Sequence, residues 1–156
     1  EKWTNVNLKQ SIHSILSFEE HTLIKNNIHV TLDCSEEINL YLIQESLEMV
    51  MINLIINAVD AMENGGEISI ICTGSEEEVT ITVSDTGSGI PQEIRANIFN
   101  PFFTTKENRN GGGLGLYIVY NEISKVNGKI TVESEVGKGT TFTIVIPVRK
   151  GEESHG

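Results

Sequence analysis

The chain has 156 residues, of which 38% are hydrophobic and 21% are charged, as in an ordinary soluble globular protein. Its net charge of −11 argues against a nucleic-acid surface, which would show a basic stripe, and disfavours contact with an anionic membrane face. We expect one domain with a single core over residues 1–150, followed by a frayed tail over residues 151–156.

The cysteines and the apolar segments give no sign of secretion or of membrane insertion. Cys34 and Cys72 have neither metal-ligand nor redox-motif spacing, which favours two free thiols in a reducing compartment. The most apolar stretch, residues 50–59, is too short and too interrupted to span a bilayer, and no signal peptide opens the chain. We therefore expect a cytoplasmic domain with no direct membrane contact, whether or not its parent protein is anchored in a membrane.

The first part of the chain predicts two helices on either side of a strand. Apolar residues three or four apart predict a helix over residues 6–26, and alternation predicts a strand over residues 28–32. A polar connection follows over residues 33–39. Residues 42–62 predict a second helix, whose single apolar stripe consists of Leu47, Val50, Met51, Leu54, Ala58 and Met62.

The remainder predicts two pairs of strands separated by helical segments. We expect, in chain order, strands over 67–73 and 79–84, a short helix over 91–99, a helix over 114–126, and strands over 129–134 and 140–148. The polar, glycine-rich residues 107–113 are typical of a mobile lid. The order α-β-α-β-β-α-β-β predicts an α/β sandwich of the α+β class, with one mixed five-stranded sheet carrying about three main helices on one face.

The helix over residues 42–62 also carries a polar face. Asn53, Asn57 and Asp60 stand at positions i, i+4 and i+7, so their side chains lie on one face away from the apolar stripe. An asparagine inside a helix costs about 0.5 kcal/mol relative to alanine, so two of them within an apolar helix indicate a polar task. A merely solvated face is the alternative that spacing leaves open.

Three glycine clusters stand at the ends of predicted elements. Asp85-x-Gly87-x-Gly89 follows a strand, where a carboxylate beside closely approaching backbone can hold a flat polar ligand. Residues 111–115 precede a helix, and the amides of a helix N-terminus favour phosphate; no Lys-Ser/Thr follows, so this is not a Walker loop. Gly137-x-Gly139 precedes the last strand. Each cluster taken alone is more often a turn.

Together and in this order, the segments resemble the ATP-binding (HATPase) domain of bacterial sensor histidine kinases and their GHKL relatives. The likeness covers residues 5–147 and implies a Bergerat fold with ATP and Mg²⁺ as cofactors. The matching segments are Asn53-Leu-Ile-Ile-Asn57-Ala (N box), Asp85-Thr-Gly-Ser-Gly89-Ile (first glycine box), Ile98-Phe-Asn-Pro-Phe-Phe-Thr-Thr-Lys106 (F box of nitrogen-regulator-type kinases), Gly111-Gly-Gly-Leu-Gly-Leu116 (second glycine box) and Gly137-Lys-Gly-Thr-Thr-Phe142.

The resemblance implies that one end of the site recognises adenine. Asp85 accepts the hydrogen of the adenine amino group, a task that suits a carboxylate. Gly87 and Gly89 let the backbone approach the base, Ile90 packs near it, and Thr140 reaches it through water.

The other end is implied to hold the phosphates and the metal. Asn57 gives its amide oxygen to Mg²⁺, which phosphates and water otherwise hold, and Asn53 supports the phosphates. Lys106, beside Thr105, neutralises the terminal phosphate, so Asn57 and Lys106 are the implied catalytic residues. The phosphate cradle of the second glycine box consists of Gly111, Gly112, Gly113, Leu114, Gly115 and Leu116.

One residue departs from the family pattern. Many histidine kinases carry a phosphate-contacting lysine three residues after the second asparagine, where this chain has Asp60. An acid is repelled by triphosphate, so Asp60 is left without a role and more weight falls on Lys106. Arg95 and Arg109 could assist Lys106 at the phosphates, but we expect both to be surface charges.

The chain lacks the phosphoacceptor of the family, a histidine in a His-Glu-x-Arg/Lys-Asn-Pro-like box. We expect ordinary surface histidines, namely His13, His21, His29 and His155. The resemblance thus implies a catalytic domain without its dimerisation and phosphoacceptor domain. It would transfer the γ-phosphoryl group of ATP to a histidine of that separate domain, which feeds a response regulator, and the parent protein would be a homodimer.

Three alternatives remain open. A GHKL-type serine kinase of the anti-sigma kind and a non-catalytic nucleotide sensor would share the same pocket. Asp85-Thr-Gly-Ser88 also matches the active-site tetrad of aspartic proteases, which must pair two carboxylates. The long helices and the asparagine pair have no place in a protease of that type.

Overall fold

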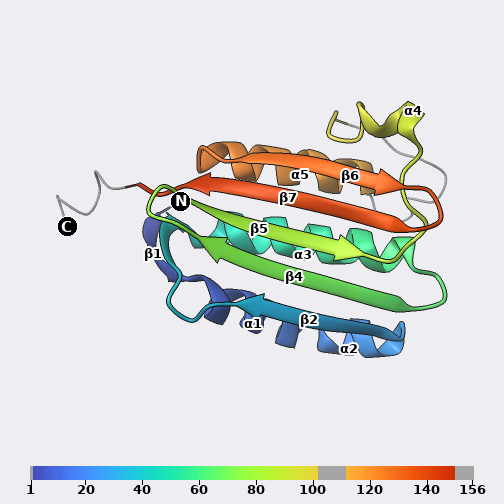
Figure 1. Cartoon of the computed structure of the whole chain (residues 1–156), viewed down its shortest axis with the longest axis horizontal. Helices are drawn as coiled ribbons and strands as arrows, with labels where there is room; N and C mark the ends of the chain where they lie inside the picture. The colour runs from blue at the N-terminus through green and yellow to red at the C-terminus, as the bar shows by residue number, and fades with distance from the viewer. Residues whose placement is uncertain (1, 102–111, 150–156) are drawn as a thin grey trace.

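The chain folds into a layer of helices packed on a layer of strands (Figure 1). The computed structural model describes residues 2–101 and 112–149, with the backbone alone for residues 112–114. Its elements are β1 Trp3–Asn7, α1 Leu8–Phe18, α2 Glu20–Lys25, β2 Ile28–Cys34, β3 Asn39–Ile43, α3 Gln44–Ala61, β4 Gly66–Gly74, β5 Glu78–Asp85, α4 Gln92–Arg95, α5 Gly112–Lys125, β6 Lys129–Glu135 and β7 Gly139–Pro147.

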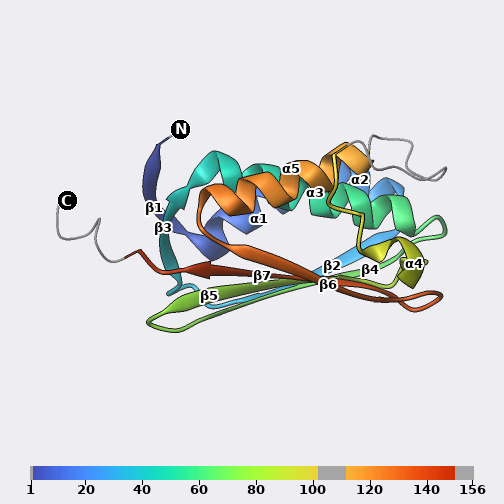
Figure 2. The same ribbon diagram turned by 90° about the horizontal axis from the view of Figure 1, so that it is seen from above.

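The main sheet has five strands in the order β2-β4-β5-β7-β6. β2 pairs with β4 in parallel, whereas the other three pairs are antiparallel, so the sheet is mixed. Figure 2 shows α1, α3 and α5 on one face of this sheet. The predicted sandwich, with one mixed five-stranded sheet and three main helices on one face, is confirmed.

The core lies between the sheet and these helices. Strands contribute alternate residues to it, as in β7, where Phe142, Ile144 and Ile146 are buried. All six residues of the apolar stripe predicted for α3 are buried, which confirms the helical period read from the sequence. Burying each such large apolar side chain contributes about 1.5–3 kcal/mol.

The first 43 residues differ from the prediction. Trp3–Asn7 is the strand β1 and pairs antiparallel with β3, Asn39–Ile43, in a separate two-stranded sheet. The helix predicted from residue 6 therefore starts only at Leu8, where the Asn7 side chain caps it by accepting a hydrogen bond from the Gln10 N–H at 2.9 Å. Residues 39–43 form a strand before α3, where the sequence predicted the end of a polar connection and the start of a helix.

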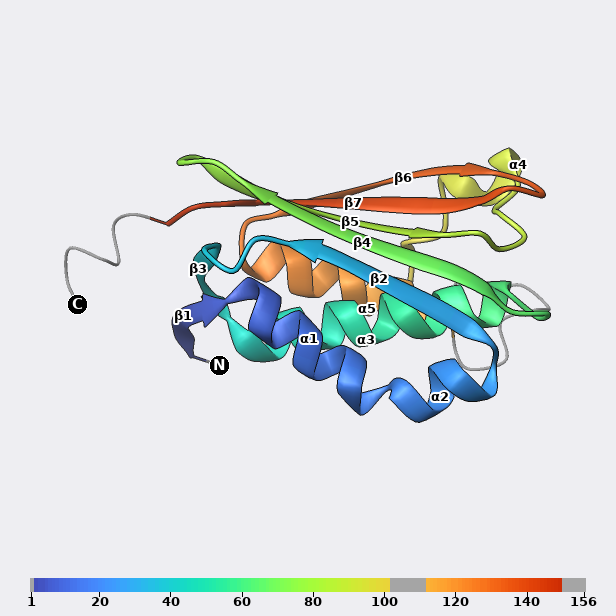
Figure 3. The same cartoon turned by 60° about the horizontal axis from the view of Figure 1, so that its bottom comes forward.

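The predicted first helix is also divided. α1 ends at Phe18, Glu19 lies between the two helices, and α2 begins at Glu20. The break separates the buried residues of α1 from Leu23, the buried residue of α2. α1 packs against α3, and α2 lies against β2 (Figure 3). Among the helices within the described residues, none has both the length and the apolar character needed to cross a bilayer.

Candidate functional site

The first glycine loop lies where three parts of the fold meet. The end of β5, the β6–β7 turn and the end of α3 come together at one end of the sandwich (Figure 1). The Ser88 N–H donates to the carbonyl oxygen of Ala61 at the end of α3, at 3.0 Å. The Ser88 carbonyl oxygen accepts from the Gly137 N–H in the β6–β7 turn, at 2.8 Å. The loop is thus fixed on both sides before any ligand is bound.

Two of its glycines are required by close backbone contact. A β-carbon at position 87 would lie 2.7 Å from both the Cβ and the carbonyl oxygen of Ala61. Gly89 has a φ of +81°, and a β-carbon there would overlap the carbonyl group of Glu135. Larger residues would push the loop away from α3 and from the β6–β7 turn.

We expect Gly89→Ala to destabilise the fold by about 3 kcal/mol or more, measured by urea unfolding. The matched control is Gly137→Ala, because Gly137 has a similar φ of +86° but open space where its β-carbon would lie. The control isolates the cost of the left-handed backbone, about 1–2 kcal/mol. Equal losses in the two variants would contradict a close contact at position 89.

Asp85 is the last residue of β5 and lies in the sheet between Ile68 of β4 and Thr140 of β7. Its Oδ1 accepts a hydrogen bond from the Gly87 N–H at 2.8 Å, and the backbone of Thr140 donates a second. Burial raises the pKa of the Asp85 carboxyl, and the two hydrogen bonds lower it by less. The site therefore holds an acceptor group in a partly desolvated position, where a matching donor gains most.

Ser134 of β6 connects the loop to the last strand, a role that the sequence did not suggest. Its hydroxyl oxygen accepts from the Ile90 N–H at 2.7 Å, and its O–H donates to the Gly139 carbonyl oxygen at 2.9 Å. The buried Thr140 hydroxyl lies 2.8 Å from the same oxygen. The sequence pattern that could have indicated this role is the position of Ser134 on the same strand face as the apolar Ile130 and Val132.

Ser134→Ala is expected to lower the free energy of unfolding by about 1–3 kcal/mol, because the Ile90 N–H and the Thr140 hydroxyl lose their partner. Denaturant unfolding measures the loss. Ser84→Ala serves as the control, since among the described residues the Ser84 hydroxyl has one hydrogen-bond partner, the Thr141 hydroxyl. An Ser134→Ala loss no larger than that of Ser84→Ala would show that the three contacts are not stabilising.

α3 connects the two glycine boxes. Its Asn53 Oδ1 would lie 3.0 Å from a β-carbon at Gly115 of α5, and eight residues later Ala61 contacts Gly87. Asn57 stands halfway between these two contacts, half-buried, and it makes no side-chain hydrogen bond within the described residues. The Asn53 amide donates to the Met49 carbonyl oxygen at 2.7 Å, which leaves its Oδ1 toward α5.

The other predicted site residues divide into two groups. Ile90 is half-buried against the core, and Leu116 is buried, with its side chain packed in the core. Gly112, Gly113 and Leu114 form the first residues of α5. The positions that lie outside the described residues are Thr105, Lys106, Arg109 and Gly111.

Arg95 is not the surface charge that was expected. It is half-buried at the end of α4, and its Nη2 donates to the carbonyl oxygen of Ile90 at 2.8 Å. The guanidinium thereby holds the residue that follows the first glycine loop. Asp60 is half-buried on α3 and keeps no assigned role.

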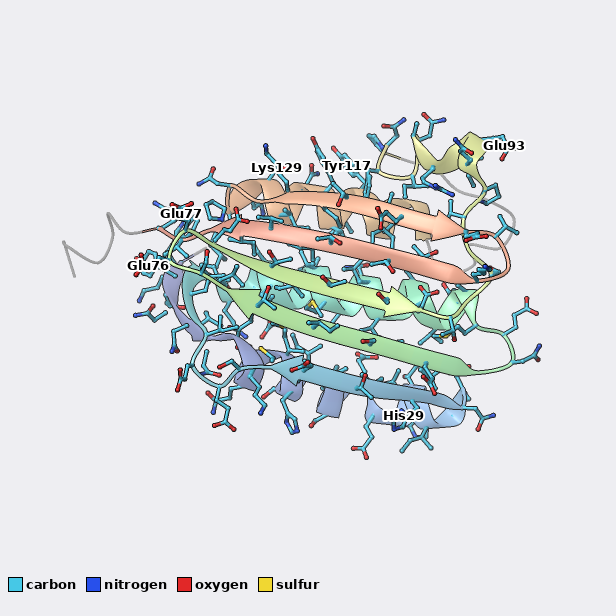
Figure 4. All side chains as sticks on the ribbon, viewed as in Figure 1. His29, Glu76, Glu77, Glu93, Tyr117 and Lys129 are labelled. Carbon is cyan, nitrogen blue, oxygen red and sulfur yellow. The ribbon has the colours of Figure 1, made fainter. Side chains whose placement is uncertain are left out.

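The three described histidines lie at the surface, as predicted: His13, His21 and His29 are all exposed, and Figure 4 labels His29 on β2. His155 lies outside the described residues. No three His, Cys, Asp or Glu side chains cluster as a metal site in the part of the chain that is described.

Comparison with known proteins agrees with this geometry. Residues 43–150 match the model of the histidine kinase-, DNA gyrase B- and HSP90-like ATPase family. Sporulation kinase A of Bacillus subtilis is 40% identical over 144 residues, which are 91% of this chain and 23% of that protein. The chain spans between 12% and 24% of the length of the curated relatives that it matches first.

Solved structures agree in both fold and extent. The catalytic domain of the histidine kinase ThkA has 31% identity and a TM-score of 0.84, with 95% of this chain and 97% of that chain covered. The complex of ThkA with the response regulator protein TrrA gives 30% identity and a TM-score of 0.80, with 94% and 42% covered.

The chain belongs to the histidine kinase-, DNA gyrase B- and HSP90-like ATPase family. Within that family it is placed among the catalytic domains of histidine kinases by its similarity to the ThkA domain over nearly the whole of both chains.

Proposed function

We propose that this domain binds ATP with Mg²⁺ and donates the γ-phosphoryl group to a histidine on a separate dimerisation and phosphoacceptor domain, from which a response regulator receives it. The observation that carries the proposal is the position of Asn57 on α3, between the contact with Gly87 at one end and the contact with Gly115 at the other. Eight residues of helix separate these contacts by about 12 Å, comparable with the length of an extended nucleotide.

The adenine end of the proposed site is formed by the loop that follows β5. The half-buried Asp85 carboxylate accepts the adenine amino hydrogen, and Gly87 and Gly89 keep the backbone close enough for the base to lie against it. Ser134 and Arg95 fix the two sides of Ile90, so the wall beside the base is held by hydrogen bonds. Thr140 supports the same wall through its bond to Ser134 and reaches the base through water.

The phosphate end is formed by the start of α5 and the polar face of α3. The helix dipole and the free amides at the α5 N-terminus favour phosphate, with Gly112 to Gly115 in its first turn. Asn53 supports that turn, and Asn57 offers its amide oxygen to the metal. Mg²⁺ supplies charge neutralisation at the phosphates. Thr105, Lys106, Gly111 and Leu116 complete the proposed phosphate side, with Lys106 at the terminal phosphate.

The domain's own residues then bind and orient the donor. Phosphoryl transfer depends on position and charge more than on covalent chemistry by the protein, so an acceptor histidine must come from another domain. The exposed His13, His21 and His29 lie on α1, α2 and β2 and offer no box of the phosphoacceptor type.

The partners are proposed from the relatives. ThkA, which is 30% identical in that structure, is a histidine kinase in complex with a response regulator protein. We infer the same pairing here, together with a homodimeric parent protein and a cytoplasmic position for this domain. The F box over residues 98–106 favours the nitrogen-regulator-type subgroup.

The deciding experiment supplies the acceptor in trans. The domain is mixed with ATP carrying a γ-phosphorus label, Mg²⁺ and the dimerisation hairpin of sporulation kinase A. Label that appears on the hairpin histidine, is lost in acid and is absent without Mg²⁺ would support the proposal. Acid-stable phosphoserine would point to a serine kinase. ATP binding without transfer to this hairpin or to that of a second relative would point to a nucleotide sensor.

A further inference from the structure

Two cysteines that are 38 positions apart in the chain lie side by side in the sheet. Cys34 is the last residue of β2, and Cys72 is its direct partner in the parallel strand β4. Both side chains are buried, with 6% and 5% of their surface exposed. Neighbouring strands are about 4.8 Å apart, within the Cα separation of about 4.4–6.8 Å that a disulfide requires.

The two thiols already interact. Each thiol lies close enough to the other to affect its pKa, and the Cys34 thiol donates a hydrogen bond to the Ser35 carbonyl oxygen, at 3.7 Å. Both cysteines are free. Forming a bond between the sulfur atoms would therefore need little movement of either strand.

A groove of about 800 Å³ gives access to the pair. Cys34 and Cys72 line it together with Ile38, Val148 and the acidic residues Asp33 and Glu76. It lies at the end of the sheet marked by the β4–β5 turn, where Figure 4 labels Glu76 and Glu77, and thus at the end away from Asp85. Because both cysteines line this groove, it offers a route for a small uncharged oxidant to the thiols.

We infer that Cys34 and Cys72 form an oxidation site at which a peroxide converts the two thiols into a reversible intramolecular disulfide. With hydrogen peroxide, one sulfur attacks a peroxide oxygen, the O–O bond breaks, one water leaves, and a sulfenic acid remains. The second sulfur then displaces the hydroxyl group as water, and the Sγ–Sγ bond forms. In sum, the two thiols lose two protons and two electrons, and the peroxide is reduced to two molecules of water.

The environment makes the pair a slow sensor rather than a constant disulfide. Burial raises the pKa of both thiols, so little thiolate is present at neutral pH. Since the thiolate is the reacting form, the pair stays reduced in a thiol-buffered compartment and responds to strong or sustained oxidant.

The disulfide would change the domain without blocking the nucleotide site. It closes a loop over residues 34–72, which contains β3 and the whole of α3, and it joins the edge strand β2 covalently to β4. Closing a loop of this length restricts the unfolded chain and raises stability. Ile81 pairs with Cys72, and Asp85 lies four residues further along β5, or about 13 Å away.

The test treats the reduced domain with hydrogen peroxide. We expect the intact mass to fall by two hydrogen atoms, the non-reduced digest to contain a peptide joined through Cys34 and Cys72, and the thermal midpoint to rise by roughly 5–10 °C. Dithiothreitol should reverse all three changes. The affinity for a fluorescent ATP analogue should stay within about twofold, so this result does not depend on the proposed kinase activity.

Cys34→Ala and Cys72→Ala are the matched controls, and neither should show the rise in midpoint. Separate sulfinic or sulfonic acids at the two positions, disulfides only between molecules, or unchanged thiols under peroxide would each overturn the inference. If a variant does not fold, the mass and the peptide map of the unmodified sequence still decide the question.

Discussion

Replacing Asp85 by asparagine is expected to weaken ATP binding by about 100-fold, or about 3 kcal/mol. The substitution keeps one oxygen, which can still accept from the Gly87 N–H at the end of β5. It replaces the second carboxylate oxygen by an NH₂ group, which faces the donor amino group of adenine. Two hydrogen-bond donors, the asparagine NH₂ group and the adenine amino group, then face each other without water, which is unfavourable. Adenine thereby loses the acceptor that mainly recognises it. Titration of a fluorescent ATP analogue measures the change.

The same variant separates recognition from folding. The raised pKa of Asp85 means that the folded state favours the protonated form, so the stability linked to this group is lost as the pH rises through that pKa. At neutral pH the buried charge therefore opposes folding. Asp85→Asn removes that charge, and its unfolding midpoint at pH 7 should equal or exceed that of the unchanged domain.

Asp85→Ala is the harsher variant, since it also removes the acceptor for the Gly87 N–H.

GTP provides a second readout for Asp85→Asn, because the NH₂ group of asparagine can donate to the carbonyl oxygen of guanine. GTP affinity should rise relative to ATP affinity in Asp85→Asn. An unchanged ATP affinity in this variant would remove Asp85 from adenine recognition.

Asn57→Ala should reduce Mg²⁺-dependent transfer to a histidine by at least about 100-fold. Asn57 is half-buried on α3 and is not used in hydrogen bonding within the described residues, so its amide oxygen is available to the metal. In the N box, Asn53 cannot replace it, because its amide is bonded to Met49 and its oxygen faces Gly115. The measurement is the initial rate of phosphohistidine formation as a function of Mg²⁺ concentration.

Loss of folding would not explain this result. Alanine is the better helix former, so Asn57→Ala should be at least as stable as the unchanged domain. Nucleotide binding in EDTA should be nearly unchanged, since adenine recognition lies elsewhere. Asn57→Asp keeps an oxygen at the same place and should retain part of the activity at high Mg²⁺ concentration. Near-normal transfer by Asn57→Ala would contradict its role at the metal.

The sequence predicted the elements whose periodicity extends over many residues. The stripe of α3 repeats over 16 positions from Leu47 to Met62, and the strands of the two hairpins alternate over at least six residues each. β1 and β3 were missed because each has only five residues and because the residues that pair between them are 32 to 40 positions apart in the chain. Leu40 and Leu42 of β3 alternate, yet so short an apolar run is equally compatible with the start of a helix.

For the candidate site, order along the chain carried most of the information. The five boxes indicated the residues at the ends of the elements, with Asp85 among them. Ser134 could not be found in this way, since its bond to Ile90 spans 44 residues and depends on how β6 packs beside the loop. Arg95 was misread because charge predicts exposure, whereas its guanidinium is turned back onto the Ile90 carbonyl oxygen.

The attachment of the first glycine loop to Ala61, Ser134 and Gly137 has a consequence for nucleotide choice. A rigid receptor loses little entropy when the base enters, so the purine should contribute a similar share of affinity to AMP, ADP and ATP. Discrimination among the three nucleotides must then arise almost entirely at the opposite end, from the groups that surround the terminal phosphates. After phosphoryl transfer, the ADP that remains would thus be released because its phosphate contacts change, while the contacts of its base are unchanged.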